Sequence, residues 1–344
     1  QVEDLVSASA ESIRFVVPRS ASGSRLDRFV VSACAELPDA PSRAEVQRWI
    51  ESGAVFLRGA AGKAKDALRE GDEVVVTPRA PRTSDAVADP SVQFTLLHID
   101  DDLLVIDKPP GLVVHPAAGH ETGTLVNGLL ARGWFRVDDV ADPDDAEGHL
   151  RPGIVHRLDK GTSGIMVVAR NAKSREALKA QFQIHSIDRE YEAICIGAPL
   201  KQTIATLHGR HPIERMKFTT KVRDGKRAET HVTPLATETG KWGTYSHVVC
   251  RLETGRTHQI RVHLAEVARA PIFGDPVYGG IPNDPHAKRL ANQLGRQALH
   301  ARLLGFVHPK TGERLVFTSA APADFQAVRE ALLPASVTAG AASA

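Results

Sequence analysis

One short segment, residues 156–164, carries the residue types best suited to catalysis. Its sequence, HRLDKGTSG, places a single carboxylate, Asp159, between an arginine and a glycine-containing turn, with strand-like apolar runs at 153–155 and 165–169. A lone carboxylate presented on a loop between buried strands is a candidate nucleophile or general base. In the alternative interpretation, Asp159 caps the backbone amides of a structural turn and Arg157 only pairs with it. The residue types alone leave both interpretations open.

The elements that must position this segment fall into two predicted units of the 344-residue chain. Residues 12–77 have the pattern of a small independent module of two helices and a few short strands. Residues 78–92 are rich in Pro, Ser and charge without periodicity, which predicts a linker. Residues 93–334 form the large unit, and the small, polar residues 335–344 predict a disordered tail.

In the first unit the sequence predicts two helices. The first begins at Arg25 with Ser24 as its N-cap, and the second begins with a capping box at residues 42–45 and ends at Gly53. Short strands are predicted at residues 54–57 and 74–76.

In the large unit, strand-like segments outnumber helical ones and do not alternate with them. This pattern predicts an α+β fold with a mainly antiparallel sheet. Helices are predicted at residues 171–183, 257–268 and 324–333, the first with Asn171 as its N-cap. Strands are predicted at residues 94–99, 103–107, 189–196, 204–208, 229–236, 245–252 and 314–318.

The charge of the chain is nearly balanced overall but unevenly distributed. Residues 85–150 hold 13 Asp/Glu and 3 Lys/Arg, whereas residues 151–231 hold 16 Lys/Arg and 8 Asp/Glu. Seven of these basic residues lie between 210 and 227, a stretch that we expect to contact phosphate groups. Basic surface beside a candidate catalytic acid favours a polyanionic substrate. The alternative is that both stretches are solvated faces of a mixed surface.

The cysteines and histidines indicate neither a disulfide framework nor a metal site. Cys34, Cys195 and Cys250 are far apart in apolar contexts, which is typical of a reducing compartment. His258 and His263 are five residues apart rather than four, so we interpret them as structural or as contacts to a polyanionic substrate, and we expect no metal. No apolar run approaches the roughly 20 residues that span a bilayer. We therefore expect a cytoplasmic protein without a membrane span.

Several segments of the large unit together resemble one enzyme family. Residues 156–164 resemble the signature of the RluA-type pseudouridine synthases, and residues 108–116, KPPGLVVHP, resemble the opening segment of that family. The other matching segments, in the order of the family, are 189–193 (REYEA), 254–263 (TGRTHQIRVH), 274–275 (GD), 278–279 (YG) and 298–301 (ALHA). The resemblance implies a mixed-sheet α+β pseudouridine synthase catalytic domain.

The first unit resembles an S4 RNA-binding module, a small α/β domain of the αL type. The matching residues are Arg25, Leu26, Asp27, Ser42, Arg43, Ile50, Gly53, Gly71 and Asp72. One departure is Arg58-Gly59, which stands where the S4 pattern usually carries Asn-Gly. The S4-like unit followed by this catalytic domain is most similar to the RluD-like subgroup, whose members modify large-subunit ribosomal RNA.

The family resemblance implies a role for each candidate residue. Asp159 corresponds to the catalytic aspartate and Arg261 to the arginine that pairs with it, with Arg256 as the competing assignment. An arginine counter-charge favours the ionised form of a carboxylate. Tyr191 corresponds to the tyrosine that stacks on uracil, although a core aromatic residue is the alternative. Leu299 resembles the apolar wall beneath the base, or a plain core leucine.

The remaining candidates are expected to contact RNA. Arg157 lies two residues before the acid, on the same side of an extended segment, and we expect it to fill the gap that a flipped uridine leaves. Contact with backbone phosphate is the alternative for Arg157. In the S4-like unit, Arg25, Ser42 and Arg43 are the expected RNA-binding residues.

The resemblance implies an isomerase that acts without a cofactor on ribosomal RNA or pre-ribosomal particles, as a monomer. Asp159 attacks C1′, attacks C6 or assists proton removal at C2′, and the sequence does not choose among these. One rival is a noncatalytic RNA-binding protein, which would not need the acid, tyrosine and arginine together. A second rival is an aspartate-nucleophile hydrolase of small molecules, which predicts a second acid or a metal beside Asp159 and leaves the S4-like unit without a purpose.

Overall fold

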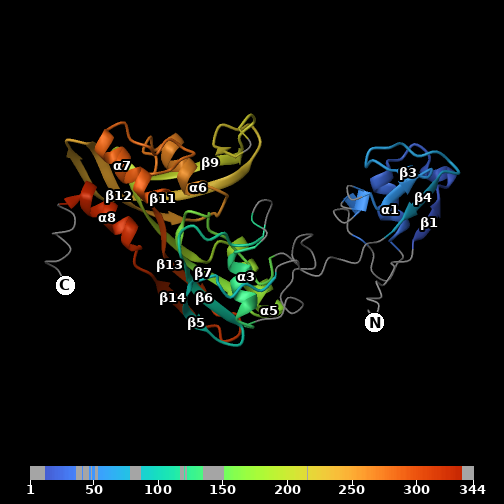
Figure 1. The fold of residues 1–344 in the computed structure, drawn as a ribbon, viewed down its shortest axis with the longest axis horizontal. Helices are drawn as coiled ribbons and strands as arrows, with labels where there is room; N and C mark the ends of the chain where they lie inside the picture. Colours follow the sequence, from blue (N-terminus) through green and yellow to red (C-terminus); the bar gives the residue numbers. More distant parts are fainter. Residues whose placement is uncertain are drawn as a thin grey trace, which may run out of the picture. The chain divides into compact units, whose positions relative to one another are not determined.

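The computed structural model describes residues 12–35, 41, 46–47, 49–50, 53–77, 87–116, 120, 122–134, 151–214 and 216–334. These residues fall into two compact units, one ending at Thr77 and one beginning at Val87 (Figure 1). None of the helices among them is long and apolar enough to cross a membrane. Several sequence predictions lie outside the described residues: Ser42 and Arg43, the capping box at 42–45, most of the linker and the tail at 335–344.

The first unit is a four-stranded antiparallel sheet with a helix packed on it. Its strands are β1 (Ile13–Val16), β2 (Val55–Leu57), β3 (Ala60–Ala61) and β4 (Glu73–Val76), in the order β1-β4-β2-β3. A short 3-10 turn (Arg19–Ala21) precedes helix α1 (Leu26–Ala33), whose buried face includes Leu26, Phe29 and Val30. The predicted N-cap of this helix is wrong. Arg25 occupies that position, because the Ser24 hydroxyl donates to the Ala21 carbonyl instead.

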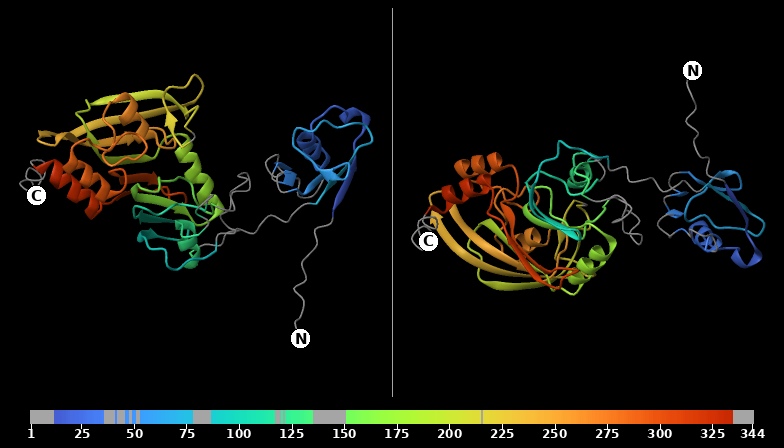
Figure 2. Two further views of the ribbon diagram at one scale, coloured as in Figure 1. Left: turned by 45° about the horizontal axis from the view of Figure 1, so that its top comes forward. Right: turned by 90° about the horizontal axis from the view of Figure 1, so that it is seen from below.

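The second unit is built on one ten-stranded sheet. The strands are β5 (Thr95–Ile99), β6 (Leu103–Lys108), β7 (Ser163–Ala169), β8 (Asp188–Ile196), β9 (Gln202–Arg210), β10 (Phe218–Thr219), β11 (Lys226–Gly240), β12 (Gly243–Leu252), β13 (Leu299–Val307) and β14 (Arg314–Thr318). Their order is β10-β9-β11-β12-β8-β13-β7-β6-β5, with β14 paired to β13. Figure 2 shows a continuous curved sheet, from the yellow β9 and β11 to the teal β5 and β6. The predicted mainly antiparallel α+β fold is confirmed, with β7–β13 as the parallel pair.

Helices cover both faces of the sheet where β6 and β7 lie. Leu104 and Ile106 alternate with Leu103 and Val105, so the two pairs point to opposite faces. The first pair packs with helix α3 (Leu125–Ala131), and the second packs with helix α5 (Ala172–Gln183). The Asn171 side chain accepts from the Ser174 backbone amide, as predicted for the N-cap of α5. Burial on both faces explains why these strands are continuous apolar runs.

The far end of the sheet carries the remaining helices. Helix α7 (Pro285–Leu294) and helix α8 (Ala323–Leu332) contribute to the largest apolar cluster (Figure 1). The predicted helix at 257–268 is divided into α6 (Gln259–Val262) and a π-helical turn, His263–Val267. The strand-like run at 153–155 is not a strand. It makes one isolated bridge, from Ile154 to Val168.

The parallel contact between β7 and β13 places the acid-bearing segment. Ser163 lies opposite His300 and Gly164 opposite Ala301, so the loop before β7 lies beside the start of β13, at Leu299. Gly164 has φ +116°, and a Cβ atom there would lie 2.3 Å from the Ala301 carbonyl oxygen. Only glycine therefore permits the close approach of these two strands.

Candidate active site

A pocket of about 370 Å³ opens at the loop that carries Asp159. The six candidate residues of the large unit all line it: Arg157, Asp159, Tyr191, Arg256, Arg261 and Leu299. They come from the loop before β7, from β8, from α6 and the segment leading into it, and from the start of β13. Residues spread over more than 140 positions of sequence thus meet at one concave site, which is the typical form of a ligand-binding pocket.

Arg261 is the arginine that reaches the acid. Its Nη1 donates to Asp159 Oδ2 at 3.1 Å, while Nε and Nη2 donate to the two oxygens of Asp275 at 2.7 and 2.9 Å. Burial opposes the charged guanidinium, but the hydrogen bonds and charges of Asp275 and then Asp159 raise the pKa of Arg261. The arginine is therefore permanently charged, and Asp275, which is fully buried, holds it toward Asp159.

Arg256 lines the same pocket, but its guanidinium bonds a backbone carbonyl instead of Asp159. Its Nε donates to the Arg227 carbonyl at 3.0 Å, and its backbone amide donates to Gln259 Oε1 at 2.9 Å. This geometry assigns the pairing with Asp159 to Arg261 and leaves Arg256 at the pocket wall beside the basic β11.

Hydrogen bonds to its backbone carbonyls hold the loop that bears Asp159 in place. The Thr162 amide donates to the Asp159 carbonyl at 3.0 Å, and the Gly111 amide donates to the Lys160 carbonyl at 2.7 Å. The buried Lys108 ammonium also reaches this carbonyl, at 3.4 Å, and donates to two carbonyls of the 109–112 turn at 2.9 and 3.0 Å. Burial lowers the pKa of Lys108 to about 7, against the opposing effect of the charge on Asp159.

Tyr191 and Leu299 form apolar surface beside the acid. Tyr191 packs against two apolar clusters, and burial raises the pKa of its hydroxyl, which keeps it neutral. Leu299 is 4% exposed. An aromatic ring and an aliphatic side chain facing a carboxylate suit a flat, neutral base better than a charged small molecule.

Arg157 is exposed at the mouth of the pocket. Its Nη1 lies 3.1 Å from Nε2 of the buried His115, a residue of the 108–116 segment. Both Arg157 and Asp159 line the pocket, as the extended spacing predicted.

Sequence reasoning missed two side chains of this site. His258 Nε2 lies 3.8 Å from Asp159 Oδ2, and its Nδ1 lies 2.9 Å from the Tyr278 hydroxyl. Both residues belong to segments that carried the family resemblance, and this was the available signal. His263 is instead structural, because its two ring nitrogens bond the hydroxyls of Thr206 and Thr230 at 3.0 and 2.9 Å.

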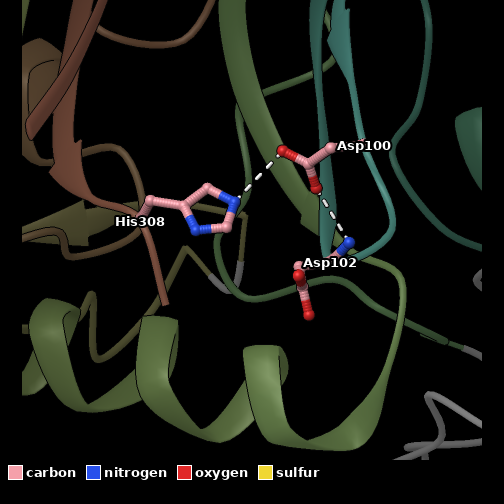
Figure 3. Close-up of side chains that lie close together, drawn as sticks. All are labelled: Asp100, Asp102 and His308. Carbon is pink, nitrogen blue, oxygen red and sulfur yellow. Dashed lines mark hydrogen bonds and ion pairs between the residues drawn. The ribbon is translucent and has the colours of Figure 1, made fainter. Parts of the chain in front are cut away.

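Figure 3 shows a separate cluster whose residue types can bind metals. The Nε2 atom of its histidine carries a hydrogen, however, and so is not free to bind a metal. Asp100, Asp102 and His308 lie together, and none of them lines the pocket. The amides of Lys310 and Thr311 both donate to His308 Nδ1, at 3.2 and 3.1 Å. Nδ1 is therefore unprotonated, and Nε2 donates its hydrogen to Asp100 at 3.1 Å. We interpret the cluster as structural: its hydrogen bonds join the turn between β5 and β6 to the turn between β13 and β14.

Comparison with known proteins agrees with the geometry. The family model described as RNA pseudouridylate synthase matches residues 102–266. "Uncharacterized RNA pseudouridine synthase YlyB" of Bacillus subtilis is 40% identical over 310 residues, which are 90% of this chain and 94% of that protein. The chain belongs to the RNA pseudouridine synthase family. It is accordingly an isomerase.

Two further relatives of this pseudouridine synthase are informative. "Ribosomal large subunit pseudouridine synthase D" of Xanthomonas campestris is 41% identical over 323 residues, which are 92% of this chain and 91% of that protein. The solved structure of "Human RNA Pseudouridylate Synthase Domain Containing 1" has 22% identity and a TM-score of 0.50, and covers 67% of this chain and 84% of its own. That likeness concerns the fold alone.

Proposed function

We propose that the protein isomerises specific uridines of large-subunit ribosomal RNA to pseudouridine, with Asp159 as the nucleophile or base. The observation that carries this proposal is the ion pair of Asp159 with the buried Arg261, in a pocket walled by Tyr191 and Leu299. The substrate class is supported by the name of the Xanthomonas relative, whose match spans nearly the whole chain.

The reaction breaks the bond between C1′ and N1, turns the freed uracil and joins C1′ to C5. N1 gains a proton and C5 loses one, so the product is an isomer and no oxidant, reductant or cofactor takes part. Asp159 starts the reaction, and Arg261 stabilises its ionised form. The charge of Arg261 is fixed by Asp275, so the ion pair does not need to reorganise during the reaction.

The pocket walls hold the detached uracil during its rotation. The ring of Tyr191 stacks on the base, and its neutral hydroxyl takes part in the transfer of the proton that leaves C5. Leu299, on the neighbouring strand β13, adds apolar surface beside Tyr191. Arg157, exposed at the mouth, takes the place of the flipped nucleotide in the RNA stack.

The basic stretch at 210–227 contacts phosphates around the flipped uridine. Its described residues surround β10 and the start of β11, and the Arg227 side chain is 76% exposed. Arg256 joins this surface through its bond to the Arg227 carbonyl. Such contacts supply affinity that depends on salt but not on sequence.

The first unit is proposed as an S4-like RNA-binding module that recruits ribosomal RNA. Arg25 is well placed for a phosphate contact, since its guanidinium is fixed by Asp27 at 2.9 Å while 38% of the side chain remains exposed. Ser42 and Arg43, which lie outside the described residues, are also proposed to contact RNA. The protein is further proposed to work in the cytoplasm, where its proposed substrate resides. It is proposed to work as a monomer, because all six candidate residues of the pocket come from one chain.

The decisive experiment follows the hydrogen that leaves C5. RNA carrying [5-³H]uridine releases tritium to water when pseudouridine forms. Asp159→Asn and Asp159→Ala are expected to abolish release while RNA affinity persists, because the carboxylate and not the fold is removed. Full activity of Asp159→Asn would disprove the assigned role, and absence of release by the wild-type protein on large-subunit RNA would disprove the substrate.

A further inference from the structure

The orientation of the Asp159 carboxylate is set from one side. Arg261 Nη1 and His258 Nε2 both face the same oxygen, Oδ2, at 3.1 and 3.8 Å. This arrangement leaves Oδ1 for the substrate. The distance to His258 exceeds that of a hydrogen bond but is close enough for its N–H dipole to act on the carboxylate.

The hydrogen positions of His258 follow from its neighbours. The Phe218 backbone amide donates to the Tyr278 hydroxyl oxygen at 2.9 Å, so the Tyr278 hydroxyl hydrogen is available for His258 Nδ1, also at 2.9 Å. A ring that accepts at Nδ1 carries its hydrogen on Nε2, which is the atom that faces Asp159. Burial lowers the pKa of His258, against the effect of Asp159, so the neutral ring with this single donor prevails near neutral pH.

The backbone at His258 supports a role for its side chain. His258 caps α6 with φ +60° and ψ +16°, a left-handed conformation that is uncommon for residues other than glycine. Backbone strain of this kind is concentrated at functional sites. Glycine would relieve the strain but would remove the imidazole from the pocket.

The hydrogen-bond chain begins in the basic region that is proposed to bind RNA. Phe218 opens β10, its ring stacks on His208 at 5.5 Å, and it meets the His258 ring edge-on at 5.7 Å. The next two residues, Thr219 and Thr220, bond the Glu266 carboxylate at 2.7 to 2.8 Å. Glu266 thus anchors β10 to the π-helical turn after α6.

We propose that His258 is a positioning residue for Asp159, and that β10 sets its orientation through Tyr278. The hydrogen bonds run from the Phe218 amide to Tyr278 and from Tyr278 to His258, whose Nε2 faces Asp159 Oδ2 at 3.8 Å. RNA seated on the basic surface around β10 thereby acts on the carboxylate that starts the reaction. This inference rests on the proposed function and adds a link between the RNA-binding surface and the reacting group.

The first test compares His258→Leu with His258→Gln. Both side chains are unbranched at Cβ and meet the same backbone strain, but only glutamine offers an N–H donor near the position of Nε2. With [5-³H]uridine RNA, His258→Leu is expected to lower kcat about ten-fold, and His258→Gln to recover most of that loss, with KM within about two-fold for both. Equal kcat values for the two variants, or a change confined to KM, would overturn the positioning role.

The second test addresses the coupling to β10. Tyr278→Phe removes the hydroxyl between Phe218 and His258, and Glu266→Ala removes the three hydrogen bonds that anchor β10. Each is expected to lower kcat by about three- to ten-fold. If both act through the same series of contacts, the kcat of the double variant should be no lower than that of the more impaired single variant. Losses that multiply would refute the coupling.

Tyr245→Phe is the matched control, because it removes a buried tyrosine hydroxyl that bonds the Trp242 carbonyl and does not line the pocket. Its kcat is expected to stay within about two-fold of wild type. Tritium release by the wild-type protein tests the proposed function separately. An active wild type with unaffected His258 variants would reject this inference alone.

Discussion

Asp275→Asn tests whether a buried ion pair holds Arg261 at the reacting carboxylate. Asp275 is fully buried and receives Nε and Nη2 of Arg261 at 2.7 and 2.9 Å. The amides of Val277 and Tyr278 also donate to its Oδ1, at 2.8 and 3.2 Å. Asparagine keeps the shape but turns one acceptor oxygen into an NH₂ group that faces other donors.

The expected loss of stability is large because the arginine stays buried. Removing one partner of a buried pair costs about 3–5 kcal/mol, since the other charge is left uncompensated. Asp159 still offers one contact to the guanidinium, so we expect the lower end, about 3 kcal/mol. We also expect kcat to fall by up to about a hundred-fold, because Nη1 is no longer fixed toward Asp159.

The assay is urea unfolding at pH 7, followed by tryptophan fluorescence in a Trp49→Phe background. The two remaining tryptophans, Trp134 and Trp242, then report on the large unit alone. Tritium release measures kcat on the same samples.

Asp324→Asn is the matched control for this substitution. Asp324 also binds an arginine, Arg296, through two bonds of 2.8 Å, but its side chain is 39% exposed. Arg296 is itself buried, but water reaches the Asp324 carboxylate and the Gly161 and Gln297 carbonyls still accept from the guanidinium. The expected loss is therefore smaller, about 1 kcal/mol. Equal losses for the two variants, or a loss below about 1 kcal/mol for Asp275→Asn, would refute the argument from burial.

Three further predictions concern the framework of the protein. Burial opposes ionisation of Asp100, but hydrogen bonds from His98, the Leu103 and Asp102 amides and His308 lower its pKa to about 2. Because the folded-state pKa is depressed, this stabilisation is complete above about pH 4 and is lost as pH falls toward 2. Asp100→Asn should therefore cost about 1–2 kcal/mol at pH 7, and urea unfolding at several pH values should show the difference vanish in acid. Gly164→Ala should cost more than about 3 kcal/mol of stability, because its Cβ would meet the Ala301 backbone. Gly279→Ala is the control: Gly279 has φ +85° and nothing within 4 Å, so the variant should lose only about 1–2 kcal/mol. Similar melting temperatures for the two variants would contradict this prediction. Deletion of residues 1–80 should leave a cooperative melting transition and weaken modification of ribosomal RNA, and loss of that transition would argue against two independent units.

The elements that could be predicted from the sequence have strong local signals. The Asn171 cap and apolar stripe of α5 and the alternating residues of β14 needed no distant partner. Helix α7 was missed although Asp284 caps it, Pro285 begins it and Gly295 ends it in a left-handed conformation. That failure was one of recognition, because the signals were present in the chain.

Strand β13 was missed for a physical reason. Its sequence, LHARLLGFV, contains leucine, alanine and arginine, which are good helix formers. Its conformation is fixed by β8 along its length and by β7 at its start, which are distant in sequence, and by the nearby β14. Tertiary pairing overrides local propensity in such a strand.

The sequence by itself indicated which residues to propose for the chemistry. The 156–164 segment and the tyrosine and arginine segments named Asp159, Tyr191 and Arg261 before any coordinates, because family motifs preserve residue type and order. It could not choose between Arg261, on the helix predicted at 257–268, and Arg256, just before that helix. Only the tertiary structure decided this, since Asp275 directs Arg261 to the acid while the Arg227 carbonyl holds Arg256 away. Likewise, the place of His258 beside Asp159 depends on β10 and Tyr278, contacts that no local pattern records.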